Sequence, residues 1–189
     1  MGGATGGTPI VLVSGPPASG KTFVAEALAE RLGIPLLAKD EFKETLFDQL
    51  GAGDLQWSQR LGRATFALLF QVLELELEAR RSVIVEANFR AVEARRTLQA
   101  LAERYSFDSF EIHCTASREV LLARYAARAN SRHPGHVDGQ RLPDLVTAID
   151  ERRHVPLALG GPCVVLETTD FGSVDLEALL EAVDLHLRR

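Results

Sequence analysis

A short segment near the N-terminus carries the residue types that bind phosphate. Gly15-Pro16-Pro17-Ala18-Ser19-Gly20-Lys21-Thr22 matches the pattern G-x-x-x-x-G-K-[ST] at every fixed position. Glycines let the backbone turn so that successive N–H groups point at phosphate oxygens. The lysine reaches between the β- and γ-phosphates, and the threonine hydroxyl is a ligand that suits Mg²⁺. The segment therefore predicts a site for ATP or GTP together with Mg²⁺.

Asp40 is a candidate general base. It follows the short apolar run at 34–38, which we predict to be a strand. The carboxyl ends of strands in an open α/β sheet lie beside the ligand crevice. A carboxylate at that place can accept the proton of a hydroxyl that attacks phosphorus. Spacing alone does not separate Asp40 from Glu41, and an N-cap role for Asp40 is the structural alternative.

Arginines are concentrated in a later segment of this acidic chain. Arg124 and Arg128 are four residues apart in a predicted helix, so they share a face, and Arg132 follows in a predicted loop. Phosphoryl transfer spreads negative charge over the equatorial oxygens, and arginines stabilise that charge. Pro134-Gly135 would help this segment bend over a ligand.

Five short apolar runs alternate with helical patterns along the chain, which favours a parallel sheet covered on both faces. The predicted strands span 10–14, 34–38, 82–86, 107–114 and 163–167. The predicted helices span 22–32, 41–50, 58–81, 91–105, 117–130, 143–154 and 174–187. We expect loops at 51–57 and 131–142, where turn-forming residues gather.

The composition is that of one globular domain. The chain has 189 residues, 46% of them hydrophobic and 25% charged, with a net charge of −5. We expect a flexible tail at 1–8 and a single domain at 9–189. The acidic charge disfavours bulk binding to nucleic acid or membrane, and no run is long enough to span a bilayer. Cys114 and Cys163 each lie in an apolar run, which favours buried free thiols and a cytoplasmic protein.

With these motifs the chain resembles the P-loop kinases, AAA-type small kinases in the branch that includes polynucleotide 5′-kinases, zeta toxins and chloramphenicol phosphotransferase. The resemblance covers nearly the whole chain in the order of its elements. It implies a three-layer α/β fold with a five-stranded parallel sheet in the order 2-3-1-4-5. It also implies an Arg-rich lid at about 124–142, in which Arg124, Arg128 and Arg132 close over the nucleotide.

The resemblance also implies roles around the acceptor. It assigns Asp40 as the general base and places a phosphate-facing cation at Lys43, where relatives usually have arginine. It places an acidic residue at the end of the third strand, here Glu86 where relatives usually have aspartate. Glu86 would hold a Mg²⁺-bound water or orient the acceptor, and Asn88 would hydrogen-bond the acceptor or the carboxylate.

The acceptor pocket is expected beneath the helices and loop at about 41–81. This segment contains Trp57 and several phenylalanines, of which one or two would form an apolar wall. Together with the acidic net charge, this favours a small hydroxylated acceptor such as an antibiotic, a nucleoside or a sugar. The expected function is transfer of the γ-phosphate to such a hydroxyl by a monomer or homodimer.

Two other functions stay open at this point. The first is a polynucleotide or nucleotide 5′-kinase, which would hold a phosphate backbone with basic residues and would bind in a salt-dependent way. Those residues would be Lys39, Lys43, Arg90, Arg95 and Arg96. The second is a toxin-like or regulatory nucleotide-binding module without the expected phosphotransfer.

Overall fold

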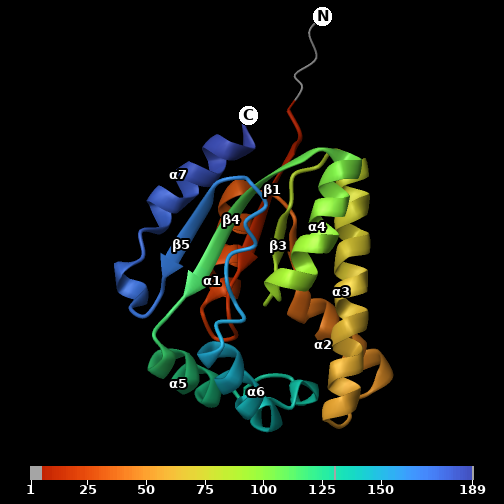
Figure 1. Ribbon diagram of the computed structural model, residues 1–189, viewed down its shortest axis with the longest axis vertical. Helices are drawn as coiled ribbons and strands as arrows, with labels where there is room; N and C mark the ends of the chain where they lie inside the picture. Colours follow the sequence, from red (N-terminus) through yellow and green to blue (C-terminus); the bar gives the residue numbers. More distant parts are fainter. Residues whose placement is uncertain (1–5, 130, 189) are drawn as a thin grey trace, which may run out of the picture.

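The computed structural model describes residues 6–129 and 131–188. A five-stranded sheet forms its centre, with every neighbouring pair parallel and the order β2-β3-β1-β4-β5 (Figure 1). The strands are β1 Thr8–Ser14, β2 Leu36–Ala38, β3 Ile84–Glu86, β4 Phe107–Thr115 and β5 Cys163–Glu167. The predicted fold class and strand order are therefore confirmed.

Helices cover both faces of the sheet and one of its ends. They are α1 Lys21–Leu32, α2 Lys39–Leu50, α3 Leu55–Glu78, α4 Ala91–Tyr105, α5 Arg118–Arg128, α6 Asp138–Asp150 and α7 Leu176–Leu187, with short 3₁₀ helices η1 Pro134–His136 and η2 Phe171–Ser173. The residues of α1 and α7 pack on one face, and those of α3 and α4 pack on the other. Helices α2, α5 and α6 gather at the carboxyl end of the strands (Figure 1).

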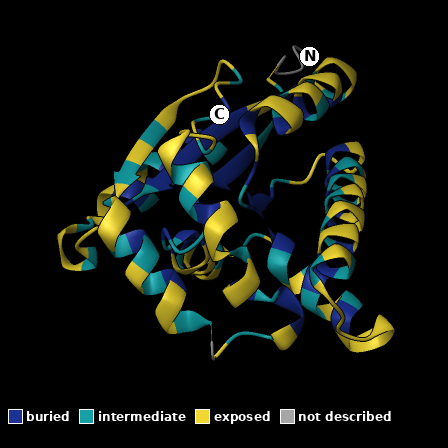
Figure 2. Ribbon diagram, turned by 60° about the horizontal axis from the view of Figure 1, so that its bottom comes forward, coloured by how far each residue is buried: buried dark blue, intermediate teal, exposed yellow. Residues whose placement is uncertain are grey.

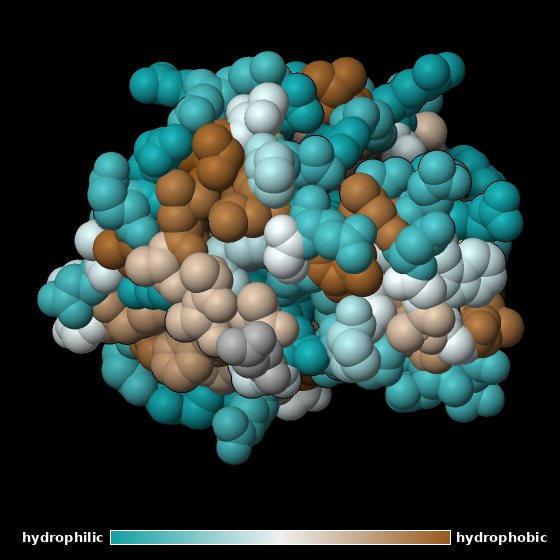
Figure 3. Space-filling model, turned by 90° about the horizontal axis from the view of Figure 1, so that it is seen from below, coloured by the Kyte–Doolittle hydropathy of each residue, from teal (hydrophilic) through white to brown (hydrophobic). Residues whose placement is uncertain are grey.

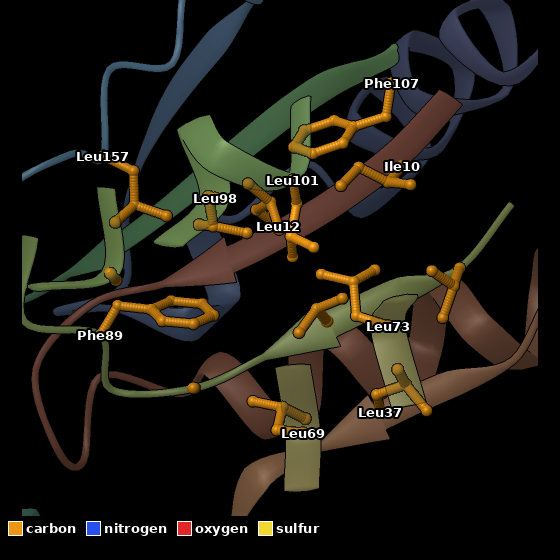
Figure 4. Packing of buried hydrophobic residues seen from close by; sticks show 14 of the residues in the cluster. Ile10, Leu12, Leu37, Leu69, Leu73, Phe89, Leu98, Leu101, Phe107 and Leu157 are labelled. Carbon is orange, nitrogen blue, oxygen red and sulfur yellow. The ribbon is translucent and has the colours of Figure 1, made fainter. Parts of the chain in front are cut away.

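The central strand β1 shows why the strands are short apolar runs. Ile10 and Leu12 point into the cluster with α3 and α4, whereas Val11 and Val13 point into the cluster with α1 and α7. All four are fully buried, as expected for a parallel strand with both faces covered. Figure 4 shows the first cluster, and Figure 2 shows buried strands beneath helices whose outer faces are exposed.

The start of α2 corrects one prediction. The helix begins at Lys39 and its N-cap is Ala38, so Asp40 lies inside the first turn and is not the cap. The Asp40 carboxylate is instead bonded to the side chains of Lys39 and Arg132. The N-cap alternative for Asp40 rested on the frequency of aspartate at that position.

Two predicted loops are shorter than expected. Helix α3 begins at Leu55, since the Asp54 carboxylate accepts a hydrogen bond from the Trp57 backbone N–H at 2.8 Å. Helix α6 begins at Asp138 and continues through Pro143. The expected loops at 51–57 and 131–142 are therefore too long at their C-terminal ends, where the helices have already begun. Contacts of Asp138 within the fold, described below, outweigh the local tendency of proline to mark a helix boundary.

The cysteines and the N-terminal segment differ in part from expectation. Both cysteines are free, but only Cys114 is buried, and Cys163 is exposed because β5 is the edge strand. The predicted tail at 1–8 lies mostly outside the described residues, and Thr8 already belongs to β1. No helix in the described parts of the chain has the length and apolar character needed to cross a membrane.

Candidate active site

The phosphate-binding loop joins β1 to α1 and depends on its glycines. Gly15 has a φ of +135°, and a Cβ there would lie 2.1 Å from the carbonyl oxygen of Cys114. Gly20 has a φ of +79°, and a Cβ there would lie 2.0 Å from the ring of Phe171. No L side chain fits either position. The fixed glycines of the motif are thus explained by backbone conformation and by close packing.

Lys21 lies at the first turn of α1 and is buried. Its Nζ donates a hydrogen bond to the carbonyl oxygen of Pro16 at 3.0 Å and lies 3.8 Å from the Glu86 carboxylate. Burial lowers the pKa of Lys21, although Glu86 and Asp40 oppose the shift. Burial likewise raises the pKa of Glu86. The pair places a cation and a carboxylate at the mouth of the phosphate loop.

One cavity of about 210 Å³ joins the loop to the carboxylates and to the lid. Among the predicted site residues, its lining includes Pro17, Lys21, Thr22, Asp40, Glu86, Asn88, Arg128 and Arg132. The structure therefore brings together residues from four separate segments at the carboxyl end of the sheet. Figure 3 views this end of the molecule, where hydrophilic residues cover most of the surface between separate apolar patches.

Asp40 sits between two cations in this cavity. The Nζ of Lys39 donates to Asp40 Oδ1 at 2.8 Å, and Arg132 Nη2 donates to Asp40 Oδ2. Burial alone would raise the pKa of Asp40, but Lys39 and Arg132 outweigh it and hold the pKa well below its ordinary value. Asp40 is therefore an ionised hydrogen-bond acceptor near neutral pH. Glu41, the alternative candidate for the general base, is exposed and does not line the cavity.

A network of side chains holds the segment between α5 and α6, which belongs to the expected lid, against α2. Arg132 also donates to Asp138 at 3.1 Å, and the Tyr125 hydroxyl donates to the same carboxylate at 3.1 Å. Nε2 of His136 lies 2.8 Å from the carboxylate of Glu44 in α2. Burial, reinforced by Arg132, lowers the pKa of His136 to about 3, so its ring is neutral in the folded protein.

The other two predicted lid arginines have different surroundings. Arg128 lines the cavity, its guanidinium lies 4.8 Å over the ring of Tyr125, and its Nε is 3.6 Å from Asp138. That Nε is buried and has no hydrogen-bond partner among the described residues. Arg124 points elsewhere: it donates to the carbonyl oxygen of Thr168 at 2.8 Å and lies 4.6 Å over Phe171. Arg124 therefore fastens the lid helix to the segment after β5.

The remaining predicted residues fall in three places. Ser19 is fully buried inside the phosphate loop, and Ala18 adopts a φ of +66° there. Lys43 lines a second cavity that adjoins the first. Trp57 lines neither cavity: its indole N–H donates to the carbonyl oxygen of Gly51 at 2.9 Å at the outer end of α3.

Sequence reasoning missed several residues of the first cavity. Lys39 is bonded to Asp40, whereas the sequence indicated only that it is one of several basic residues that could hold a phosphate backbone. Asp138 organises the lid, and its one available signal was that it is the lone acid in the arginine-rich segment. His136, Arg141 and His154 also line the cavity, and nothing in their local spacing indicates this.

The donor set suits a cation that is held largely by its ligand. In residues 6–129 and 131–188, no group of three or more histidine, cysteine, aspartate or glutamate side chains could hold a metal by itself. Thr22 and Glu86 supply a hydroxyl and a carboxylate to one cavity, and oxygen ligands are those that Mg²⁺ prefers. Mg²⁺ usually combines few protein ligands with nucleotide phosphates and water, so these residues fit it.

Comparison with known proteins identifies relatives of the whole fold. Residues 10–150 match the family model described as an AAA domain. A proposed kinase from Chloroflexus aurantiacus is 37% identical, with a TM-score of 0.86, covering 95% of this chain and 99% of the other. No curated protein matches the chain significantly.

More distant structures share the fold alone. A gluconokinase from Sinorhizobium meliloti is 20% identical, with a TM-score of 0.54 and coverage of 96% of this chain and 91% of the other. A sugar kinase from Janibacter sp. is 18% identical, with a TM-score of 0.57 and coverage of 95% and 94%. These matches support the sheet order and the layers described above.

Proposed function

The chain belongs to the AAA domain family, and from that premise we propose that it is a kinase that transfers the γ-phosphate of ATP or GTP to a hydroxyl group of a small molecule. One observation carries the proposal. The lysine of the phosphate loop, Lys21, and the ionised carboxylate of Asp40 line the same cavity, with Arg128 and Arg132 of the lid on its wall. The name of the Chloroflexus aurantiacus relative, a proposed kinase at 37% identity, supports the same class of reaction.

Each group in the cavity has a role in this reaction. The backbone of the phosphate loop and Lys21 would hold the β- and γ-phosphates. The acceptor hydroxyl would form a bond to the γ-phosphorus as the bond to the β–γ bridging oxygen breaks. Asp40 would accept the hydroxyl proton. Because this transfer passes through a loose transition state, the main task of Asp40 is to orient the hydroxyl, for which an ionised carboxylate of low pKa suffices.

The lid arginines would stabilise the transferred group. Arg128 lines the cavity, and its buried Nε has no hydrogen-bond partner in the described part of the chain, so its guanidinium is not committed to a protein acceptor there and would bind a phosphate oxygen. Arg132 is bonded to Asp40 and Asp138 and would keep the base in place as the lid closes. Thr22 and Glu86 are the residues that would hold Mg²⁺, Glu86 through a water. When bound, that ion would neutralise charge on the phosphate oxygens.

The polynucleotide alternative is less well supported. It depends on Lys39, Lys43, Arg90, Arg95 and Arg96 as a surface for a phosphate backbone. Lys43 is fully buried, and Nε of Arg95 donates to the carbonyl oxygen of Leu157 at 2.6 Å. Side chains used inside the fold do not form an open track for a nucleic acid. No feature of the site favours the purely regulatory module over a kinase.

A transfer assay tests the proposal. Purified protein with Mg²⁺ and γ-labelled ATP or GTP is offered three pools: antibiotics with nucleosides, sugars and sugar derivatives, and oligonucleotides with a 5′-hydroxyl. We expect label on a small molecule, and none with Lys21→Ala, which removes the phosphate-holding ammonium. Label on the oligonucleotides would replace the proposal with the polynucleotide alternative. Nucleotide binding without transfer or hydrolysis in any pool would contradict a kinase function.

A further inference from the structure

A second cavity adjoins the first at the end of the sheet. Its volume is about 540 Å³, in the range of small-molecule sites. The two cavities are neighbours, because both are lined by Lys39, Asn88, Arg90, Arg141 and Asp144. Residues of α2, α3, α4 and α6 form the wall of the second cavity, and Lys39, which it shares with the first cavity, is bonded to Asp40. The second cavity is therefore the space in which an acceptor would lie when its hydroxyl reaches the base.

The lining of this second cavity is cationic, in contrast to the acidic protein as a whole. It holds five cationic side chains and two carboxylates. The cations are Lys39, Lys43, Arg63, Arg90 and Arg141, and the acids are Glu93 and Asp144. Lys39 is already paired with Asp40 at 2.8 Å. The other four cations make no ion pair within the described part of the chain.

Among these cations, Lys43 gives the clearest indication of an anion site. It is fully buried, and its Nζ donates to the hydroxyl of Ser58 at 2.9 Å and lies 5.1 Å over the ring of Phe47. Removing an ammonium from water is costly unless an anion compensates, and neither neighbour carries charge. Burial, with the charges of Lys39 and Arg141, lowers the pKa of Lys43 to about 7. A negative group next to Lys43 would reverse that shift and relieve the cost.

The backbone of α3 approaches the end of the Lys43 side chain at Gly62. Gly62 lines the cavity, and a Cβ added there would be in ordinary van der Waals contact with Lys43, 3.9 Å from its Nζ. The rings of Phe66 and Phe70 form an apolar wall, and the Asn88 amide offers a donor and an acceptor for hydroxyls. The cavity thus combines an anion-binding end, an apolar side and polar groups near the base.

We propose that the acceptor is an anion, a small alcohol that carries a carboxylate or phosphate group bound by Lys43 with Arg141, Arg90 and Arg63. The identity of the acceptor rests on the proposed kinase function, but the anion site does not. Either group offers several oxygens to the cluster of donors, as charge-assisted hydrogen bonds require. Neutral sugars, nucleosides and neutral antibiotics would bring no negative charge to this cluster of cations.

A binding experiment tests the anion site without any transfer. The phosphate loop is first filled with Mg²⁺ and a non-hydrolysable β,γ-imido analogue of ATP. Inorganic phosphate, or acetate in a parallel series, is then titrated by calorimetry. We expect the anion to bind at one further site. Its affinity should be about tenfold or more lower in Lys43→Met and in Arg141→Gln. Arg96→Gln, an exposed position of α4 outside both cavities, is the matched control and should bind as the unchanged protein does.

Two results would overturn the anion site. One is that no anion binds beyond the phosphate loop, and the other is that Lys43→Met and Arg141→Gln bind the anion as tightly as the unchanged protein does. Arg141 is only partly buried, so its variant gives an answer even if Lys43→Met fails to fold.

A transfer experiment then separates the two anion sources. Matched aldoses, aldonic acids and aldose phosphates are offered with γ-labelled nucleotide. We expect the acid or the phosphate series to be phosphorylated with a KM at least about tenfold below that of the neutral aldose. Preference for the neutral aldose would overturn the anionic acceptor while leaving the kinase function intact. Anion binding without transfer to any acceptor would instead count against the kinase function.

Discussion

The guanidinium of Arg132 donates a hydrogen bond to the carboxylate of Asp40, a residue 92 positions earlier in the chain. This contact joins the lid between α5 and α6 to the first turn of α2. Arg132 reaches Asp40 while also bonded to Asp138, so lid position and the charge of Asp40 are coupled. A movement of the lid that separates the two side chains would raise the pKa of Asp40 toward its ordinary value, because one of the two opposing cations would be lost.

This coupling predicts the pH dependence of an Arg132→Ala variant. Arg132 helps to hold the pKa of Asp40 below the ordinary value of 3.8, so its loss raises that pKa. Asp40 must be ionised to accept a proton, and the acid limb of the kcat profile should therefore move to higher pH in the variant. The measurement is kcat against pH for both proteins. An unchanged acid limb would show that Arg132 does not set the charge of Asp40.

The proposed base is tested by Asp40→Asn. The amide keeps the shape of the carboxylate but loses the negative charge that orients the hydroxyl and accepts its proton, so turnover should fall by roughly 10²–10⁴. Nucleotide affinity should be nearly unchanged, because Lys21 and the loop backbone hold the phosphates. Glu41→Gln is the matched control, since Glu41 is the next residue and is exposed. Wild-type turnover in Asp40→Asn, or an equal loss in Glu41→Gln, would rule out the assignment.

Arg128→Ala should lower turnover more than it weakens nucleotide binding. Arg128 lines the cavity, and its guanidinium makes no hydrogen bond to the described residues through its buried Nε, so the side chain can turn toward the transferred phosphate, whose charge spreads in the transition state. Arg118→Ala lies on the same helix and removes only an exposed pair with Asp150, so it should behave as the unchanged protein does. Steady-state kinetics and nucleotide titration are compared for both. A loss of affinity with unchanged kcat would make Arg128 a ground-state binding residue.

The lid contact with α2 is tested at two glycines. A Cβ at Gly135 would lie 2.5 Å from the buried ring of Phe47, whereas a Cβ at Gly139 would meet nothing within 4 Å. Gly135→Ala should therefore destabilise the protein by about 1–3 kcal/mol and lower turnover by displacing the lid. Gly139→Ala should be neutral or stabilising by up to about 1 kcal/mol, since alanine favours the helix. Denaturant unfolding and turnover are measured together, and equal effects at the two glycines would contradict this packing.

Acid should weaken the fold through His136. Its pKa is about 3 in the folded protein and 6.5 ordinarily, so below pH 6.5 the unfolded chain binds the proton and the folded protein does not. This contribution to stability is complete above pH 6.5 and is lost as the pH falls toward 3, at no more than about 1.4 kcal/mol per pH unit. Urea unfolding of the unchanged protein and of His136→Asn from about pH 7 to about pH 5 gives the two slopes. Equal slopes would refute the role of His136.

The sequence by itself determined the fold class and the phosphate loop. Strands such as 163–167 and the helix at 91–105 lie where their apolar period predicts, because both signals are local. The glycine-rich segment needs Gly15 and Gly20 for backbone reasons that any chain of this pattern shares. The candidate base Asp40 could be found because carboxylates that follow parallel strands meet at one end of the sheet.

Only the tertiary structure decided which cations meet which carboxylates. Arg124 and Arg128 share a helix, yet one bonds to the segment after β5 and the other faces the cavity. Trp57, expected beside the acceptor, lies at the outer end of α3. Lys43 is a buried basic residue. These outcomes depend on contacts between side chains that are distant in the sequence. A local pattern states which residue types are present, whereas charge compensation depends on which of them the packing brings within a few ångströms.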